Sequence, residues 1–430
     1  MASDSSAEKK GPGRLNATFH PHTLSRATRA VHADDYINSH RAVAPPLQVS
    51  TTFRYNDDPA ELRAWDNTDP HAPYDSHMYS RDTAPNTTRF EALLSDLIGQ
   101  PTLTYASGMA AFHAMVVFLN PRRVAIGAGY HGCHGVLDVM KKLNGLEKLD
   151  LLSDSDLDKL QPGDVVHVET PLNPTGEARD LARYARIAQA KGCHLTVDAT
   201  FAPPPLLDPF QWGADVVMHS GSKYFGGHSD ILCGVLSVHK KHIKDPASRD
   251  AKDNWIAGMR YERLVIGGVM GNLEGWLGVR SMRTLELRVE RQSKNAAHLV
   301  AWLAAEQKNE GSLVSQVVER IHHASLQPEA ADKDSWLYQQ MPRGFGPVFS
   351  IVLRNETQAR RLPSKLELFH HATSLGGVES LIEWRAMTDP HVDRRLLRVS
   401  IGVEGWEDIQ ADLERAFAAL VAEGEAVNKA

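Results

Sequence analysis

Between residues 90 and 240, short apolar runs alternate with stretches of helical character, and this alternation constrains the fold more than any other feature. The apolar runs are TLTYAS, RRVAIG, DVVHVET, CHLTVDAT and GADVVMHS, and helices are predicted from Met109, from His134 and in DLARYARIAQAKG. Strands that alternate with helices favour a mostly parallel sheet with crossover helices. Ligands of such sheets bind in the loops that leave the C-terminal ends of the strands.

The rest of the chain predicts further parts, because 430 residues exceed the usual size of a single core. Residues 1 to about 20 are polar and broken by glycine and proline, so we expect disorder there. From about 40 to 90 the chain has no helical period and reads as an arm or long loop that packs on a neighbouring subunit. An amphipathic stretch from about 270 predicts one or two connecting helices. We therefore expect a disordered segment and arm over 1–60, a large domain over 61–285 and a C-terminal domain over 286–430.

Charge and hydropathy exclude several classes of partner. The net charge is -6, from 47 basic and 53 acidic residues, which gives no electrostatic case for nucleic acid or an anionic membrane. No run approaches the roughly 20 apolar residues of a membrane span, and the first 20 residues lack the apolar centre of a signal peptide. The three cysteines are an odd number in a long chain and predict reduced thiols. We expect a cytoplasmic protein without nucleic-acid or membrane partners.

The residues that end the predicted strands carry the chemistry. These segments are YASGM, GAGYHG, ETPLNPTG, VDAT and HSGSKYFGGHSD. They supply backbone amides at a helix start, an aromatic face, an amide side chain, a carboxylate, hydroxyls and a lysine. Such a set suits a phosphorylated aromatic cofactor that is held as a Schiff base.

Lys223 and Asp198 are the two most informative of these residues. A lysine at a buried strand end loses solvation of its ammonium, which makes the neutral amine available to form an imine. Asp198 ends an apolar strand 25 residues earlier, where its carboxylate could keep the pyridine nitrogen of pyridoxal phosphate protonated. Taken alone, the lysine reads as a solvated loop residue and the aspartate as a turn or cap. Their spacing, one strand-helix-strand unit, favours the functional interpretation.

Several residues could bind the phosphate of such a cofactor. The backbone N–H groups of Gly108 and Met109 start a predicted helix, and helix starts bind anions. Hydroxyls of the lysine loop, Ser220 and Ser222, could add donors, although each alone reads as a turn residue. Tyr79 and Arg81 lie in the irregular arm, where Arg81 could pair with phosphate across a subunit boundary or form an ordinary surface ion pair.

Two other interpretations attach to residues 127–134. Gly127, Gly129 and Gly132 have the G-x-G-x-x-G spacing of dinucleotide-binding folds, with Asp150 downstream. This motif alone is weak, and it lies well inside the chain rather than in the first unit. HGCH offers two histidines and a thiol, but one tight turn without a second cluster does not predict a metal site. We expect no metal.

These residues resemble the Cys/Met-metabolism group of pyridoxal-phosphate enzymes, which includes cystathionine gamma-synthase, the cystathionine lyases, methionine gamma-lyase and O-acetylhomoserine sulfhydrylase. The resemblance runs from about residue 45 to the C-terminus, and VDATFAPPPLLDPFQWGADVVMHSGSKYFGGHSDILCGVL is its most specific segment. It implies the α/β fold of a fold-type-I PLP-dependent transferase, with a mostly parallel sheet in the large domain and a smaller C-terminal α/β domain. It also implies pyridoxal 5'-phosphate as cofactor and small amino acids as substrates.

The resemblance assigns a role to each candidate residue. Lys223 holds the cofactor, and Asp198 faces the pyridine nitrogen. Tyr130, which leads the YHGCH match to the family's Y-G-G-T pattern, stacks on the ring and could act as a second acid or base, acidified by nearby positive charge. The implied substrate-binding residues are Asn173, Ser374 and Arg398, and a planar guanidinium suits a carboxylate. The implied cofactor-binding residues are Tyr79, Arg81, Gly108, Met109, Tyr130, Asn173, Asp198, Thr200, Ser220, Ser222 and Lys223.

Departures from the family pattern bear on the reaction. Methionine gamma-lyase has a cysteine two residues after the stacking tyrosine, where this chain has Gly132, with Cys133 one later. Cystathionine lyases and bacterial synthases usually have glutamate just before SLGG, where this chain has Thr373, so a cationic amino group at the far end of cystathionine or cysteine loses that partner. The arm motif S-R-x-x-N-P-T has Ala84 in place of its asparagine, although Arg81 is retained.

TSLGGVESLIEWRAMTD is most similar to fungal-type cystathionine gamma-synthases. The resemblance therefore implies gamma-replacement on an O-activated homoserine, O-acetyl-L-homoserine above all, by cysteine, another thiol or a carbon nucleophile. The alternative is a gamma-lyase of sulfur amino acids, and a catalytically silent relative and a dinucleotide oxidoreductase are further alternatives. Because Tyr79 and Arg81 would complete a neighbour's site, the minimal unit is a homodimer, and family members are commonly homotetramers.

Overall fold

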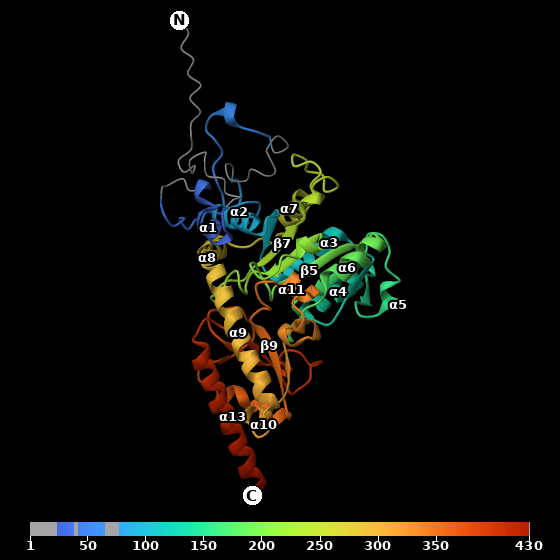
Figure 1. The fold of residues 1–430 in the computed structure, drawn as a ribbon. Helices are drawn as coiled ribbons and strands as arrows, with labels where there is room; N and C mark the ends of the chain where they lie inside the picture. The colour runs from blue at the N-terminus through green and yellow to red at the C-terminus, as the bar shows by residue number, and fades with distance from the viewer. Residues whose placement is uncertain (1–23, 38–41, 65–76, 430) are drawn as a thin grey trace.

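The computed structural model describes residues 24–37, 42–64 and 77–429, and its central feature is a seven-stranded sheet. The strand order is β1-β7-β6-β5-β4-β2-β3 (Figure 1). Only β7 runs antiparallel to its neighbours, so the predicted mostly parallel α/β sheet is confirmed. The strands are β1 Thr102–Tyr105, β2 Arg123–Ile126, β3 Glu147–Asp150, β4 Val165–Glu169, β5 His194–Asp198, β6 Val216–Ser220 and β7 Gly234–Val238.

Two of these strands were not expected from the sequence. β3 is a short edge strand of which only Leu149 is buried, so it has no apolar run to indicate it. β7 is fully buried but directly follows the lysine loop, which hides it in a segment interpreted as a site. The alternation of apolar and polar residues that predicts a strand is absent in both cases. β7 is buried on both faces, and β3 is a polar edge strand.

Helices cover both faces of this sheet because its strand residues alternate in direction. On β6, Val216 and Met218 pack with α3, α4 and α7, whereas Val217 packs in the core on the opposite face. These helices are α3 Gly108–Leu119, α4 His131–Asn144 and α7 Trp255–Ile266, and the opposite face has α2 Pro85–Ile98, α6 Leu181–Lys191 and α8 Asn272–Met282. The helix expected from His134 begins at His131, directly after Tyr130.

A second sheet of five strands has the order β10-β11-β12-β9-β8 and is antiparallel except for the pair β10 and β11. Its apolar face packs against α9 and α13 in a core of its own. The strands are β8 Val318–His322, β9 Val348–Leu353, β10 His370–His371, β11 Leu381–Trp384 and β12 Leu396–Ser400, and the helices are α9 Leu285–Lys308 and α13 Trp406–Lys429. The five strands and two helices of this second α/β unit all come after the large sheet in the sequence.

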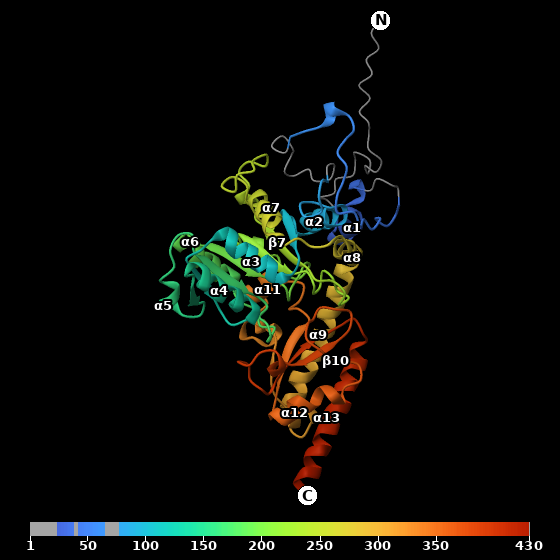
Figure 2. The same cartoon turned by 180° about the vertical axis from the view of Figure 1, so that it is seen from behind.

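The helix α9 joins the two sheets (Figure 1). Leu285 and Val289 at its start pack in the core of the large sheet, and Leu299 and Leu303 pack in the core of the small one. The amphipathic stretch thus forms two helices, α8 and α9, and α13 lies beside α9 in both views (Figure 2). Shorter helices are α1 Arg26–His32, α5 Asp154–Leu157, α10 Leu313–Val317, α11 Trp336–Gln340 and α12 Glu356–Arg361.

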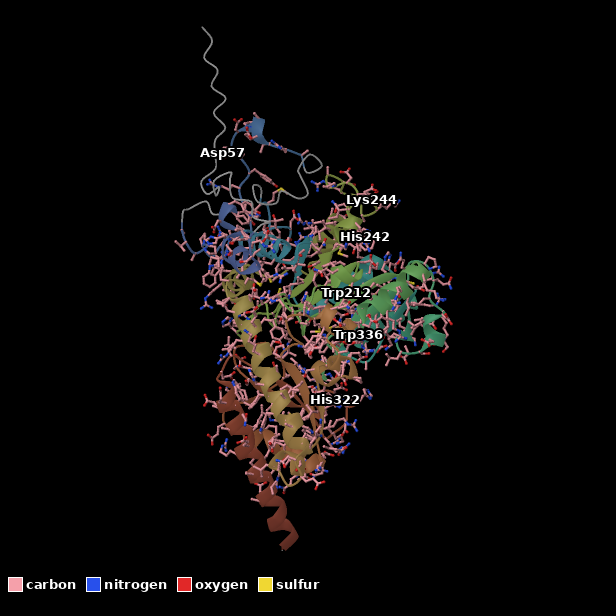
Figure 3. All side chains as sticks on the ribbon, in the orientation of Figure 1. Asp57, Trp212, His242, Lys244, His322 and Trp336 are labelled. Atoms are coloured by element: carbon pink, nitrogen blue, oxygen red, sulfur yellow. The ribbon has the colours of Figure 1, made fainter. Side chains whose placement is uncertain are left out.

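Other contacts also hold the two sheets together. His322, labelled in Figure 3 at the end of β8, has its Nδ1 3.2 Å from Oε1 of Glu177 in the loop after β4. Trp336 of α11, labelled above it, packs against the core of the large sheet. The loop edge of the large sheet is therefore held next to the small sheet.

The N-terminal part and the question of membrane helices complete the description. Thr52 and Tyr79 form an isolated antiparallel bridge, and most side chains of residues 42–62 are exposed. The disorder expected for residues 1 to about 20 lies outside the described residues. Within the described ranges, no helix is long and apolar enough to cross a membrane.

Candidate active site

A cavity of about 290 Å³ lies between the carboxyl ends of the parallel strands and the small sheet. One wall comes from residues at or after the ends of β1, β2, β4, β5 and β6. The other wall comes from residues within 373–398. Parallel strands end at one edge of a sheet, so their loops converge there. The predicted residues that line this one cavity are Gly108, Met109, Tyr130, Asn173, Asp198, Thr200, Ser220, Ser222, Lys223, Ser374 and Arg398.

Lys223 lies in the turn after β6. Its backbone N–H donates to the carbonyl of Ser220 at 3.1 Å, and its Nζ donates to Oγ of Ser374 at 2.6 Å. Burial, with a smaller effect of the nearby Arg398 guanidinium, lowers the pKa of the Lys223 ammonium to about 8. A lysine with this pKa has a substantial neutral fraction near neutral pH, which a nucleophilic amine requires.

The lysine turn needs two glycines for close packing. Gly376 has φ +81°, and a Cβ there would lie 3.0 Å from the backbone nitrogen of Tyr224. Gly227 has φ +68°, and a Cβ there would collide with the guanidinium of Arg288, whose Nη1 donates to the carbonyl of Tyr224 at 2.8 Å. Both glycines adopt the left-handed conformation that other residues avoid. The segments that contain Gly376 and Arg288 therefore pack closely against the backbone of the lysine turn and fix its position.

Asp198 ends β5 and is held by Thr200. The Thr200 hydroxyl and backbone N–H both donate to Oδ1 of Asp198, at 2.5 and 2.9 Å. The same hydroxyl accepts the backbone N–H of Ser220 at 2.8 Å, which ties the carboxylate to the lysine turn. Burial raises the pKa of Asp198, and the two bonds from Thr200 oppose that rise. Among the described residues, Oδ2 of Asp198 accepts no hydrogen bond, which leaves it for a cationic partner in the cavity.

The glycines of residues 127–132 shape the turn before α4 rather than a nucleotide site. A Cβ on Gly129 would collide with the carboxylate of Glu169, and a Cβ on Gly132 would lie 2.6 Å from the Tyr130 ring. Because these glycines lack a side chain, the carboxylate of Glu169 and the ring of Tyr130 can pack directly against the backbone of this turn. In the described part of the chain, no cluster of His, Cys, Asp and Glu is arranged to hold a metal ion.

Glu169 is a cavity residue that the sequence analysis missed. Its Oε2 accepts the backbone N–H of Tyr130 and its Oε1 accepts that of Asn173, both at 2.7 Å. Burial, with an added effect of the nearby Asp198, raises the pKa of Glu169 to about 8. The carboxyl group thus fixes two predicted site residues at once. Its position directly at the end of apolar β4 was the signal that could have found it.

Tyr130 lies at the N-terminus of α4 and is 37% exposed, so its ring borders the opening of the cavity. Burial of the hydroxyl raises the pKa of Tyr130 and outweighs the opposite effect of Arg385 and Arg398. The role of Tyr130 as a second acid or base therefore stays a prediction. Cys133, three residues further along α4, is buried in the core between the large sheet and the helices α3, α4 and α7. It does not line the cavity.

Arg398 is positioned by the register of the small sheet. It lies on β12 directly opposite Glu383 of β11, and its Nη2 donates to Oε2 of Glu383 at 2.6 Å. Nη2 also donates to the carbonyl of Ser374 at 2.8 Å, and Nη1 donates to Oδ1 of Asn173 at 3.1 Å. Burial lowers the pKa of Arg398 to about 10, so the side chain remains a cation at neutral pH. The arrangement presents a fixed guanidinium near Lys223.

A second buried arginine, Arg385, also lines the cavity and was not singled out by the sequence. Its Nη1 donates to Oε2 of Glu383 and to Oγ1 of Thr388, both at 3.0 Å. Burial alone would raise the pKa of Glu383, but Arg398 and Arg385 together hold it below its ordinary value. Glu383 is thus an ionised carboxylate shared by two arginines.

The two remaining predicted residues lie apart from this cavity. Tyr79 is 47% exposed, and the guanidinium of Arg81 lies over its ring at 5.4 Å. Nη1 of Arg81 donates to the carbonyl of Leu264 at the end of α7, at 3.0 Å. The structure therefore does not bring Tyr79 and Arg81 together with Lys223 in the same chain.

The cavity fits a phosphorylated pyridine aldehyde at both ends. Gly108 starts α3, and a Cβ there would lie 3.1 Å from Cβ of Ser220, so the absence of a side chain keeps the helix start open to the cavity. Helix N-termini bind phosphate through their unpaired N–H groups. Lys223 and Asp198 offer an amine and an unpaired carboxylate oxygen at the same edge of the sheet. These groups suit pyridoxal 5'-phosphate.

Comparison with known proteins agrees with this chemistry, and the fold and cavity define a pyridoxal-phosphate-dependent enzyme of fold type I. The chain belongs to the Cys/Met metabolism PLP-dependent enzyme family, whose model matches residues 27–418. Its cofactor is therefore pyridoxal 5'-phosphate, and its chemistry is of the trans-sulfuration type that acts on small amino acids.

Relatives in this family differ in their reactions. The chain is 31% identical to cystathionine gamma-synthase of Escherichia coli, over 92% of this chain and 99% of the relative. It is 29% identical to cystathionine gamma-lyase of Saccharomyces cerevisiae, over 91% and 96%. The solved structure of cystathionine gamma synthase from Xanthomonas oryzae pv. oryzae, in complex with aminoacrylate and cysteine, has a TM-score of 0.77 and 26% identity, covering 93% of this chain and 99% of that one. Similarity alone does not choose between replacement and elimination.

Proposed function

We propose that this enzyme catalyses gamma-replacement on an O-activated L-homoserine, with O-acetyl-L-homoserine as the donor. The incoming group is a thiol such as cysteine or another nucleophile. The observation that carries the proposal is the wall formed by Thr373, Thr388 and Arg385, which offers hydroxyls and a cation opposite the lysine. In the described part of the chain, the acidic residues that line the cavity are Glu169 and Asp198, both at the edge of the large sheet.

This wall disfavours the alternative, a gamma-lyase of cystathionine. Such a substrate carries an ammonium group at its far end, which needs an acidic partner once it leaves water. Glu383 cannot serve because both Arg398 and Arg385 already bind its carboxylate. An ammonium group beside Arg385 would meet a like charge instead. Cysteine as the incoming thiol carries an ammonium group as well. This wall therefore favours a thiol or carbon nucleophile without a cationic group over cysteine.

The residues of the large sheet hold the cofactor in this proposal. Lys223 Nζ would attach the cofactor, Oδ2 of Asp198 would keep the pyridine nitrogen protonated, and Tyr130 would contact the ring. Gly108, Met109, Ser220 and Ser222 would bind the phosphate, Thr200 orients Asp198, and Asn173 would serve the ring hydroxyl. When bound, pyridoxal 5'-phosphate supplies an electron sink for negative charge that develops on the carbon atoms of the substrate.

The residues of the small sheet bind and orient the donor. Arg398 binds its carboxylate, with Asn173 and Ser374 as neighbours that fix the guanidinium. This orientation places the α hydrogen near Nζ of Lys223, which takes the α proton and later returns it. Ser374 Oγ, 2.6 Å from Nζ, keeps the amine aimed into the cavity. Tyr130 is the second group that moves protons, at the β carbon.

The overall reaction breaks one bond at Cγ and forms another. Loss of the α proton and then of a β proton allows the Cγ–O bond to break, and acetate leaves with the bonding electrons. A thiol adds its sulfur to Cγ, and protons return to the β and α carbons. O-acetyl-L-homoserine and a thiol thus give an S-substituted homocysteine and acetic acid, with atoms and electrons balanced.

A homodimer is the minimal active unit in this proposal, and a homotetramer is the expected assembly. Tyr79 and Arg81 are exposed and lie away from the cavity of their own chain, which leaves them available to bind the phosphate of a neighbour's cofactor. The test is light scattering of the native enzyme together with mixing of two inactive variants, Arg81→Ala and Lys223→Ala. Recovered activity in the mixture supports shared sites, and a fully active monomer contradicts them.

The reaction itself is tested by product analysis. Purified enzyme, loaded with cofactor, is incubated with O-acetyl-L-homoserine and a set of thiols that includes cysteine. A new S-substituted homocysteine that appears in step with acetate supports the proposal. Release of ammonia and a 2-oxo acid from sulfur amino acids, without incorporation of any added nucleophile, would establish the lyase instead.

A further inference from the structure

Arg385 is buried in the cavity wall and only partly used by its own chain. The residue is 3% exposed, and its hydrogen bonds to Glu383 and Thr388 both come from Nη1. Among the described residues, its buried Nε has no hydrogen-bond partner. Nη2 lies 3.9 Å from Oδ2 of Asp389, which is too long for a hydrogen bond.

The unused donors form one geometric unit. Nε and Nη2 lie on the same side of the planar guanidinium, where they can donate in parallel to the two oxygens of one carboxylate. Nη1 lies on the other side and holds Glu383 and Thr388. A buried donor without an acceptor costs stability, and native proteins rarely leave one unless a ligand or water completes it. This edge of Arg385 is therefore suited to a carboxylate.

Among the described residues, the carboxylates near Arg385 do not hydrogen-bond its Nε and Nη2 edge. Glu383 is the only carboxylate that hydrogen-bonds the two cavity arginines among the described residues, and its Oε2 serves both. Arg398 is completed by Asn173 and the carbonyl of Ser374, whereas Arg385 has no such further acceptors on Nε or Nη2. Asp389 stands outside hydrogen-bond distance and turns its Oδ1 to the backbone of His391 at 3.0 Å.

Arg385 lies toward a different part of the cavity from the donor's α-carboxylate site. Its Nη1 donates to Oγ1 of Thr388, which also lines the cavity, and among the described residues none of its hydrogen bonds goes to Ser374 or Asn173. Tyr130 and His131, which also line the cavity, are both exposed. Arg398 is instead tied to Ser374, the serine that contacts Lys223.

We propose that Arg385 binds a second carboxylate at the γ side of the donor, through its Nε and Nη2 edge, and thereby selects carboxylate-bearing reactants. This inference rests on the proposed gamma-replacement. The carboxylate belongs either to the incoming nucleophile or to the acyl group that leaves, as in an O-succinyl ester. The recognition chemistry is the same for both, and kinetics distinguish them.

Binding without turnover is the first test. The cofactor-loaded enzyme, saturated with L-alanine to engage Arg398, is titrated by calorimetry with 3-(methylthio)propionate and with the matched alcohol 3-(methylthio)propan-1-ol. We expect the wild type to bind the carboxylate about tenfold or more tightly than the alcohol, and Arg385→Gln to reduce that ratio to about twofold or less. A wild type without preference, or a variant that keeps it, overturns the proposal.

Two further variants control for misfolding of Arg385→Gln and for nonspecific effects of removing an arginine. Arg385→Lys keeps the positive charge beside Glu383 but lacks the two-pronged edge, so we expect it to fold and to retain only part of the preference. If Arg385→Gln does not fold, a wild-type ratio in Arg385→Lys overturns the proposal. The matched control is Arg394→Gln, which removes an exposed arginine from the turn before β12 and should keep the wild-type ratio.

Turnover then assigns the source of the carboxylate. Two pairs are compared in wild type and Arg385→Gln: 3-mercaptopropionate with 3-mercaptopropan-1-ol, and O-succinyl- with O-acetyl-L-homoserine. A selective loss of about tenfold or more in kcat/KM for 3-mercaptopropionate assigns the carboxylate to the nucleophile, and a selective loss for the succinyl ester assigns it to the leaving group. Equal losses within both pairs overturn the proposal. If no thiol gives product, the proposed function fails, and the binding result still decides the role of Arg385.

Discussion

The two walls of the cavity are built by different physical means. The wall at the edge of the large sheet is held by short-range bonds: Thr200 to Asp198, Ser220 to Thr200, and Glu169 to two backbone amides. The wall from the small sheet is held by paired charges, with Glu383 between Arg398 and Arg385. The first wall fixes reactive groups whose pKa values are moved by burial. The second wall buries the guanidinium groups of Arg398 and Arg385 away from solvent and orients them to bind anions.

This difference separates chemistry from selection. Changes in the first wall are expected to affect the cofactor and proton transfer whatever the reactant, because every substrate uses the same lysine. Changes in the second wall are expected to affect which reactants bind, because a buried arginine without its anion keeps an incomplete hydrogen-bond set. The following variants test that division, beginning with the largest expected effect.

Lys223→Ala removes the amine of the first wall. We expect activity to fall by about 10³-fold or more with every donor and nucleophile, because the variant lacks both the attachment point and the base. The visible absorption band of bound cofactor should also be lost or shifted in the purified protein. Lys159→Ala, at an exposed lysine, should behave as the wild type. A coloured, active Lys223→Ala enzyme would refute this assignment.

Arg398→Lys changes the second wall while keeping its charge. A lysine cannot make the parallel bonds of a guanidinium, so we expect kcat/KM for O-acetyl-L-homoserine to fall by about 100-fold, mainly through KM. The cofactor absorption should stay as in the wild type, which separates this variant from those of the first wall. Steady-state kinetics at saturating thiol provide the measurement. An unchanged KM for the donor would place its carboxylate elsewhere.

Thr200→Val is a milder change in the first wall. It removes the donor to Asp198 and leaves the backbone N–H of Ser220 without its acceptor. We expect about tenfold weaker retention of cofactor, corresponding to about 1 to 2 kcal/mol for the lost bonds. Fluorescence titration of the apoenzyme measures this constant. Thr175→Val is the control, since that hydroxyl makes only a weak 3.4 Å contact with its own turn.

The pH dependence of cofactor capture gives the smallest effect. Burial lowers the pKa of Lys223 to about 8, so the neutral amine increases as the pH rises through that value and is nearly complete above it. We expect the rate at which apoenzyme captures pyridoxal 5'-phosphate to rise about tenfold between about pH 7 and pH 9 and then to level off. An unshifted lysine would keep gaining rate beyond about pH 10. Stopped-flow absorbance distinguishes the two profiles.

The sequence predicted the first wall well because its signals are local. Lys223 and Asp198 each follow an apolar strand, and parallel strands bring such positions together at one edge. Glu169 occupies an equivalent position on β4 but was overlooked, because its function is to fix two backbone amides rather than to offer a recognisable reactive group. The glycine spacing of residues 127–132 was ambiguous for the same reason. Only the neighbouring carboxylate and ring show why side chains are excluded there.

The second wall was predicted only in part, and the reason is strand register. Arg398 came from the family resemblance, whereas Glu383 and Arg385 were not identified. Glu383 is opposite Arg398 because β11 and β12 pair in one particular register, and a shift of one residue would turn the carboxylate to the other face. The sequence contains no local signal for that pairing.

By itself, the sequence determined the alternating α/β architecture and the cofactor chemistry, and it predicted the lysine and aspartate proposed to serve it, since hydrophobic periodicity and polar strand ends are encoded over a few neighbouring residues. The tertiary structure decided the pKa of Lys223, the hold of Glu169 on the Tyr130 turn and the unused edge of Arg385. These properties depend on burial and on partners from distant parts of the chain. Free energies of desolvation and pairing exist only once the two sheets have closed over the cavity.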